Sequence, residues 1–249
     1  MAPENKQIHI GTSNIVLPIT KPHYPPAYRS GSQLAYYASL FDTVEINRSF
    51  YKIPQFNTFA RWAADVPGNF RFSVKLWRGI THTNNLHFSE VDVAAFLEAA
   101  AGLGNKRACL LVQFPASVTI ALLPKVEALL RLLAAIDAAR AWQIAVEFRH
   151  RSWYTPHVYT LLDELECAVV LHDMKGSATP SLNSGAKTAY YRFHGTQPNY
   201  TGTYSTEELR AIGKQLRPLL GAGKEIYVYF NNTVGAAFEN ARDLQEIVK

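Results

Sequence analysis

The sequence predicts an α/β protein folded as a single (βα)8 barrel, a TIM-like fold with eight parallel strands. Short β-rich runs alternate with longer helical patterns from one end of the chain to the other, which is typical of parallel β/α units. The β-rich runs number eight, and the 249 residues match the usual length of one such barrel. An open doubly wound sheet would carry a glycine-rich turn after its first strand, and this chain has none there. We therefore expect one domain over residues 1–249.

The strands are expected where β-branched and aromatic residues cluster between turn residues. These runs cover residues 8–13, 42–47, 71–76, 108–114, 143–149, 168–173, 189–195 and 225–232. Helical patterns lie between them at residues 32–40, 56–65, 91–102, 121–139, 155–166, 206–220 and 236–248. Ser205 precedes two glutamates and suits a helix N-cap. Two long connections, residues 14–31 and 174–188, are expected to be loops, and the proline-rich first one should cover the mouth of the barrel.

Composition excludes several classes of protein. The chain has 25 Lys+Arg and 20 Asp+Glu, a net charge of +5, and no apolar run as long as a membrane-spanning helix requires. Its first residues do not have the layout of a secretory signal. Cys109 and Cys167 are the only cysteines and lie among apolar neighbours, which excludes a disulfide framework and favours a reducing compartment. We expect a cytoplasmic protein without membrane contact.

Polar residues occupy one parity of every predicted strand. Side chains alternate along a strand, so the apolar parity should face the helices and the other parity should face the barrel interior. In the sixth strand the expected inward set is Val169, Leu171 and Asp173. Near the strand ends, the inward parity carries these polar residues: Ser13, Glu45, Asn47, Lys75, Gln113, Glu147, Arg149, Asp173, Arg192, His194, Tyr229 and Asn231.

These strand ends are the predicted site, because active sites of such barrels lie at the carboxyl ends of the strands. Burying several charges is costly unless each is paired with an opposite charge or hydrated. The candidate catalytic residues are Glu45, Lys75, Glu147, Asp173 and His194. The candidate substrate-binding residues are Asn47, Gln113, Arg149, Trp153, Arg192, Tyr229 and Asn231. Trp153 is included because its polar neighbours place it at the surface. The alternative is a neutral salt-bridge network that only fixes the strand register.

The chemistry of these side chains favours a small anionic ligand. Lys75, Arg149 and Arg192 can donate hydrogen bonds to a phosphate or carboxylate, with Glu45 or Glu147 as the general acid or base. Lys75 can alternatively form a Schiff base.

A divalent metal held by Glu147, Asp173 and His194 is a further alternative. The neighbouring arginines oppose it, so we expect no cofactor.

Several motifs resemble a known family. The runs VEINRSFY, FRFSVKLWRGITH, LLVQFP, VEFRHRSW, YYRFHG, YVYFNN and GAAFENARDL are similar to those of the YecE-like family, domain of unknown function family 72. The resemblance covers nearly the whole chain and implies a TIM-like barrel, but it implies no reaction. Related barrels of the xylose-isomerase-like and endonuclease-IV-like kinds use Glu, His and Asp ligands at strand ends. Family members usually carry a Gly-Trp-Tyr type segment after the first strand, where residues 12–17 here read Thr-Ser-Asn-Ile-Val-Leu.

Three functions follow from these observations. The first is an enzyme, either a hydrolase or a lyase/isomerase, that acts on a small anionic, phosphorylated or nucleotide-like ligand. The second is an endonuclease-IV-like protein that binds or processes nucleic acid. The third is a non-catalytic scaffold whose polar interior is structural. The sequence predicts no oligomeric state.

Overall fold

The computed structural model describes residues 7–137 and 139–249. Residues 1–6, on which the argument against a secretory signal rests, and residue 138 of the fourth expected helix lie outside the described residues. Every predicted strand is present, and the sixth is divided in two. The strands are β1 (Ile8–Thr12), β2 (Thr43–Ile46), β3 (Arg71–Lys75), β4 (Arg107–Phe114), β5 (Gln143–Phe148), β6 (Ala168–Val169), β7 (Leu171–His172), β8 (Thr188–Phe193) and β9 (Glu225–Phe230).

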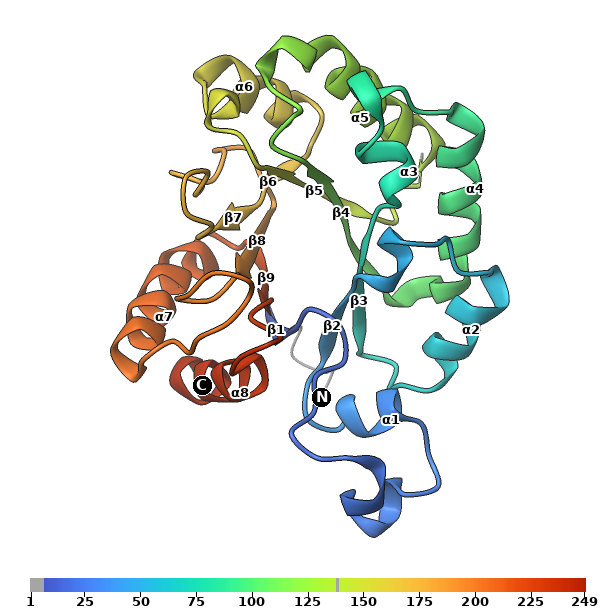
Figure 1. Ribbon diagram of the computed structural model, residues 1–249, viewed down its shortest axis with the longest axis vertical. Helices are drawn as coiled ribbons and strands as arrows, with labels where there is room; N and C mark the ends of the chain where they lie inside the picture. The colour runs from blue at the N-terminus through green and yellow to red at the C-terminus, as the bar shows by residue number, and fades with distance from the viewer. Residues whose placement is uncertain (1–6, 138) are drawn as a thin grey trace.

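The strands form two parallel sheets, which corrects the expectation of one closed eight-stranded sheet. One sheet has the order β1-β9-β8-β7 and the other β2-β3-β4-β5-β6. Together they surround a common centre (Figure 1). At one seam the strand changes partner, because the Val170 amide bonds to Val146 of β5 while Leu171 already pairs with Tyr191 of β8. At the other seam a single parallel bridge joins Ser13 to Glu45.

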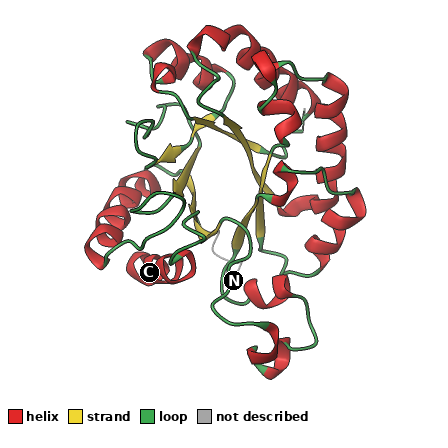
Figure 2. Ribbon diagram, viewed as in Figure 1, coloured by secondary structure: helices red, strands yellow, loops and turns green. Residues whose placement is uncertain are grey.

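Helices cover the outside of the strands (Figure 2). Seven match the predicted segments, and Ser205 caps its helix as expected, since its side chain accepts from the Glu208 amide in a capping box. A short helix after β3 was not predicted. None of the described helices is long and apolar enough to cross a membrane. The helices are α1 (Gln33–Tyr37), α2 (Phe56–Ala64), α3 (Arg78–Thr81), α4 (Glu90–Ala100), α5 (Leu123–Ile136), α6 (Pro156–Glu164), α7 (Thr206–Gly221) and α8 (Ala237–Val248).

The apolar residues form two separate cores. The larger contains the outward parity of the strands together with the helices. The smaller lies inside and includes Leu111, Tyr190, Tyr227 and Tyr229. The predicted parity agrees with these cores on every strand except the sixth.

In the sixth strand the prediction was wrong, because Val169 and Leu171 belong to the outer core and Val170 to the inner one. The run AVVL is apolar at both parities, so its alternation carries no information about direction.

Candidate active site

A buried arginine between two glutamates forms the base of the predicted site. Arg192 on β8 is 1% exposed. Its Nε and Nη2 atoms each donate to the Glu45 carboxylate at 2.9 Å, and Nη1 donates to Glu147 Oε2 at 2.6 Å. Glu45 lies on β2 and Glu147 on β5. The two carboxylates therefore hold the guanidinium from the opposite sheet, in the forked geometry that suits arginine and carboxylate.

Both glutamates stay ionised at neutral pH. Burial acts to raise the pKa of Glu45, but Arg192 and the hydroxyl donors outweigh it, so the pKa is lowered. Those donors are Ser13 Oγ and Tyr190 Oη, each 2.6 Å from the carboxylate. For Glu147, burial is likewise outweighed, here by Arg149 and Arg192, and the pKa lies well below its usual range. Both carboxylates hold arginines in place, and their role as general acid or base stays a prediction.

Arg149 and His194 form the next layer. Arg149 pairs through Nε with Glu147 and contacts the Met174 sulfur, and its Nη2 lies 2.9 Å from His194 Nε2. A guanidinium can only donate, so Nε2 is the acceptor and the imidazole proton lies on Nδ1. That atom is 3.3 Å from Asp173 Oδ1. Burial lowers the pKa of His194 to about 4, and Asp173 only partly opposes this.

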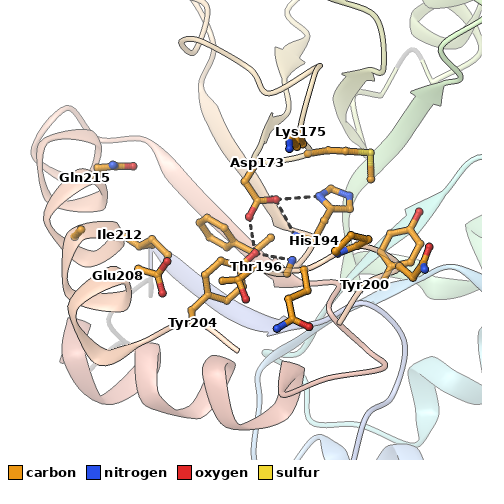
Figure 3. A pocket seen from close by; sticks show the side chains of 16 residues that line it. Asp173, Lys175, His194, Thr196, Tyr200, Tyr204, Glu208, Ile212 and Gln215 are labelled. Atoms are coloured by element: carbon orange, nitrogen blue, oxygen red, sulfur yellow. Dashed lines mark hydrogen bonds and ion pairs between the residues drawn. The ribbon is translucent and has the colours of Figure 1, made fainter. Parts of the chain in front are cut away.

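Asp173 holds His194 from the other side. Its Oδ1 accepts from the His194 backbone amide at 2.8 Å, and Oδ2 accepts from the Tyr204 hydroxyl (Figure 3). The neutral imidazole is thus fixed between a carboxylate and a guanidinium. It acts as a support for Arg149, because its basic nitrogen is occupied.

The three carboxylate and imidazole groups do not converge on one point. Glu147 Oε1 lies 3.8 Å from Nε2 of His194, whereas Asp173 lies at Nδ1 on the other side of the ring. Arg149 and Arg192 fill the Nε2 side. Among the described residues, no group of three or more His, Cys, Asp or Glu side chains is placed to hold a metal. A divalent metal does not fit this arrangement.

A cavity of about 220 Å³ opens at the carboxyl ends of the strands above Arg192. The charged residues lining it are Lys75, Arg149 and Arg192, all cationic. Asn47 and Asn231 also line it, as predicted. The sequence did not single out Asn14 and Thr233, which follow the ends of β1 and β9. The remaining lining residues are Phe50, Tyr51 and Tyr200.

Lys75 is the titratable group of this cavity. Its Nζ donates to Gln113 Oε1 at 2.8 Å and lies 3.9 Å above the centre of the Phe50 ring. Burial and the positive charge of Arg192 lower the pKa of Lys75 to about 7, against the opposite effect of Glu147 and Glu45. Near neutral pH a large fraction of this amine is unprotonated, which is the state a base or a nucleophile requires.

Seven predicted residues do not line the cavity, and two of them, Tyr229 and Trp153, also lie apart from the charged side chains around Arg192. Tyr229 is buried in the inner core, where its hydroxyl donates to Ser73 Oγ at 2.9 Å. The surface position expected for Trp153 was wrong, because its side chain is fully buried, stacks on Phe148 at 4.5 Å and donates to the Val118 carbonyl at 2.7 Å. Residues Arg151–Trp153 form a 3-10 turn, and a single turn directs neighbouring residues to different sides.

Asp173 and His194 line a second, larger space. This open groove of about 870 Å³ lies between the loop after β8 and helix α7 (Figure 3). Tyr200 lines both the groove and the smaller cavity. Of the predicted site residues, Asn47, Lys75, Arg149, Arg192 and Asn231 therefore line the cavity, and Asp173 and His194 line the groove.

Solved structures show that this fold is shared with proteins of low sequence identity. A DUF72 family protein from Enterococcus faecalis has a TM-score of 0.78 and 24% identity, covering 97% of this chain and 95% of that one. More distant likenesses include a xylose isomerase domain containing protein from Salmonella typhimurium, at a TM-score of 0.55 and 15% identity, covering 100% and 98% of the two chains. An AP endonuclease, family 2, from Brucella melitensis has a TM-score of 0.54 and 13% identity, covering 93% and 97%. The chain therefore shares a TIM-barrel-like α/β fold with these proteins.

Sequence comparison identifies the family. The UPF0759 protein YunF of Bacillus subtilis is 26% identical, over 90% of this chain and 89% of its own length. A family model described as "Protein of unknown function DUF72" matches residues 9–249. With nearly its whole length matched, the chain belongs to the DUF72 family.

Proposed function

We propose that the protein is an enzyme that binds a small phosphorylated or carboxylated ligand in the 220 Å³ cavity and transfers a proton through Lys75. One observation carries this proposal. The charged side chains lining the cavity are all cations, while the carboxylates that balance them, Glu45 and Glu147, are buried beneath. An anion entering the cavity meets hydrogen-bond donors and no opposing carboxylate.

The arginines are held ready for such a ligand. Glu45 and Glu147 use three N–H groups of Arg192, a fourth lies toward His194 Nε2 at 3.4 Å, and a guanidinium has five. The remaining Nη2 donor is fixed in direction before the ligand arrives. Preorganised donors of this kind stabilise negative charge that develops on an oxygen during a reaction.

The combination of Lys75 with two arginines favours a lyase or isomerase reaction over hydrolysis. An amine whose pKa is about 7 is suited to removing a proton beside a carbonyl, or to forming a Schiff base with it. Arg149 and Arg192 would hold the ligand's anionic group and stabilise the resulting oxyanion. Glu45 and Glu147, both bound to arginine, are not free to activate a water molecule.

Calorimetric titration at low salt tests the binding site. We expect inorganic phosphate and ribose 5-phosphate to bind and uncharged ribose not to bind. Removing a charged donor by Arg149→Met should weaken phosphate binding about 10- to 100-fold, because a hydrogen bond to a charged group contributes about 1.5–3 kcal/mol. The matched control is Lys214→Met at an exposed position of α7, which should bind as the wild type does. Wild-type protein that binds neither phosphate compound would contradict the proposal.

A further inference from the structure

Tyr200 separates the cationic cavity from the 870 Å³ groove. Its side chain is 41% exposed and lines both spaces. The ring centroid lies 5.9 Å from that of His194, which itself supports Arg149. A ligand bound to the arginines and long enough to extend into the groove would therefore pass Tyr200.

The turn that presents Tyr200 is strained. Asn199 has a φ of 61° and Tyr200 a φ of 62°, a left-handed conformation that residues other than glycine rarely adopt. The turn is closed by a bridge between Gln197 and Thr201, and the Tyr200 carbonyl accepts from the Val234 amide at 3.2 Å. Strain of this kind persists where the surrounding structure holds it, and it is concentrated at ligand sites.

The groove differs from the cavity in charge. Its two carboxylates are already bound, Asp173 to His194 and Tyr204, and Glu208 to the Ser205 amide. Lys175 is exposed at its edge. The rest of the lining is neutral and includes apolar Phe193 and Ile212 beside polar Gln197 and Gln215. Such a surface suits an uncharged group that is partly apolar and can form a few hydrogen bonds.

We propose that the ligand has two parts, an anionic group on Arg149 and Arg192 and a planar ring stacked on Tyr200 that extends into the groove along α7. A nucleoside monophosphate has this form, with one phosphate, a sugar as a short spacer and an uncharged aromatic base. Tyr51, 70% exposed at the cavity, offers a second aromatic surface beside the phosphate end. The inference rests on the proposed anion site and adds the class of molecule that the site takes.

The test compares AMP with ribose 5-phosphate, two ligands that share the phosphate and sugar and differ in the base. Stacking of a base on an aromatic side chain contributes about 1–3 kcal/mol. Wild-type protein should therefore bind AMP about 5- to 100-fold more tightly than ribose 5-phosphate. Tyr200→Ala should abolish this preference, so that AMP and ribose 5-phosphate bind alike, while Tyr200→Phe should keep the preference. Phe56→Ala, at an exposed aromatic residue of α2, is the matched control.

The outcomes separate the two proposals. Binding of ribose 5-phosphate without a preference for AMP, or a preference that survives in Tyr200→Ala, would overturn the stacking role and leave the anion site intact. Failure of both compounds to bind would remove the anion site itself. A single-stranded oligonucleotide that binds more tightly than AMP and needs Tyr200 would replace the small ligand by nucleic acid and overturn the class proposed here.

Discussion

At the scale of single residues, the protonation state of Lys75 decides whether the cavity contains a free amine that can act as a base or nucleophile, or only permanently charged side chains. The amine lies at the end of β3, with Gln113 as its hydrogen-bond acceptor. Burial removes water from the ammonium form and Arg192 repels it, so the pKa is lowered to about 7. The proton is therefore released between about pH 6 and pH 8, whereas an ordinary lysine releases it near pH 10.4.

Competitive acetylation at trace reagent concentration measures this pKa directly. The reaction rate of Lys75 should rise through an apparent pKa of about 7, because only the free amine reacts. Mass spectrometry of the peptide that contains Lys75 gives this curve, and the peptide that contains exposed Lys214 serves as the reference for labelling in the same sample. A Lys75 curve that rises only above pH 9 would show that the amine is permanently charged.

Alternation along strands predicted much of this site at the level of residues. Glu45, Lys75 and Glu147 each stand between two apolar neighbours, so their direction followed from the burial of those neighbours. Trp153 has no such flanking pattern, and its polar neighbours gave the wrong answer. Tyr200 belongs to a loop whose turn depends on tertiary contacts, such as the bond from the Val234 amide, which no local pattern records.

At the scale of elements, the seam between β1 and β2 depends on Gly11. A Cβ atom at this position would approach the Thr43 carbonyl oxygen more closely than real side chains do, and would lie 3.0 Å from the Tyr37 hydroxyl. The Tyr37 hydroxyl also contacts Thr12 and the Thr43 carbonyl. The space around Gly11 is therefore filled by the Thr43 carbonyl and the Tyr37 hydroxyl. The first is backbone and the second is held by hydrogen bonds, so neither can easily move aside.

Replacing Gly11 by alanine should lower the free energy of unfolding by about 1–3 kcal/mol, the usual cost of overpacking a core. Urea unfolding followed by circular dichroism measures it. Gly68→Ala is the control, since an added Cβ there meets nothing within 4 Å, and it should change stability little. Equal free energies of unfolding for Gly11→Ala and Gly68→Ala would contradict this prediction, since β1 and β2 would then accommodate the added methyl group without loss of stability.

Strand positions were predictable and strand connectivity was only partly so. The β-rich runs have apolar alternation and turn residues at their ends, so their bounds agree with the structure to within a few residues. The split of the sixth run at Val170 follows from hydrogen bonds to two different neighbours, β5 and β8. Because those neighbours come from distant parts of the chain, the run itself holds no sign of the break.

At the scale of the whole molecule, the polar interior joins the two sheets. Arg192 and Tyr190 of β8 bind Glu45 of β2, and Tyr229 of β9 binds Ser73 of β3. The network therefore has a structural role in addition to the proposed ligand role, as the scaffold alternative requires. The structural role and the proposed ligand role can be tested separately. Lys75 belongs to the cavity and forms no salt bridge within 4 Å among the described residues, so changing it leaves the ion pairs between the sheets in place.

Arg192→Met tests the structural role. It leaves Glu45 and Glu147 with fewer partners in a buried place, and breaking a buried ion pair in this way costs about 3–5 kcal/mol. We expect the decrease in the free energy of unfolding, measured by chemical denaturation, to be the same at 0.1 and 1 M NaCl, since salt screens buried pairs weakly. The double variant Arg192→Met, Glu45→Gln should regain part of this lost stability. A loss below 1 kcal/mol would show that the sheets hold together without the network.

The placement of Glu45 and Glu147 directly beneath the arginines also has a kinetic consequence. Arg149 and Arg192 face the cavity and the two carboxylates lie behind them, so these four charges balance and only the charge of Lys75 is uncompensated. At a distance most of the field cancels, and an approaching anion is attracted mainly once it has entered the cavity. Long-range steering, which makes association rates fall steeply with ionic strength, would then be weak. Discrimination between anions would reside in how slowly the correct one leaves.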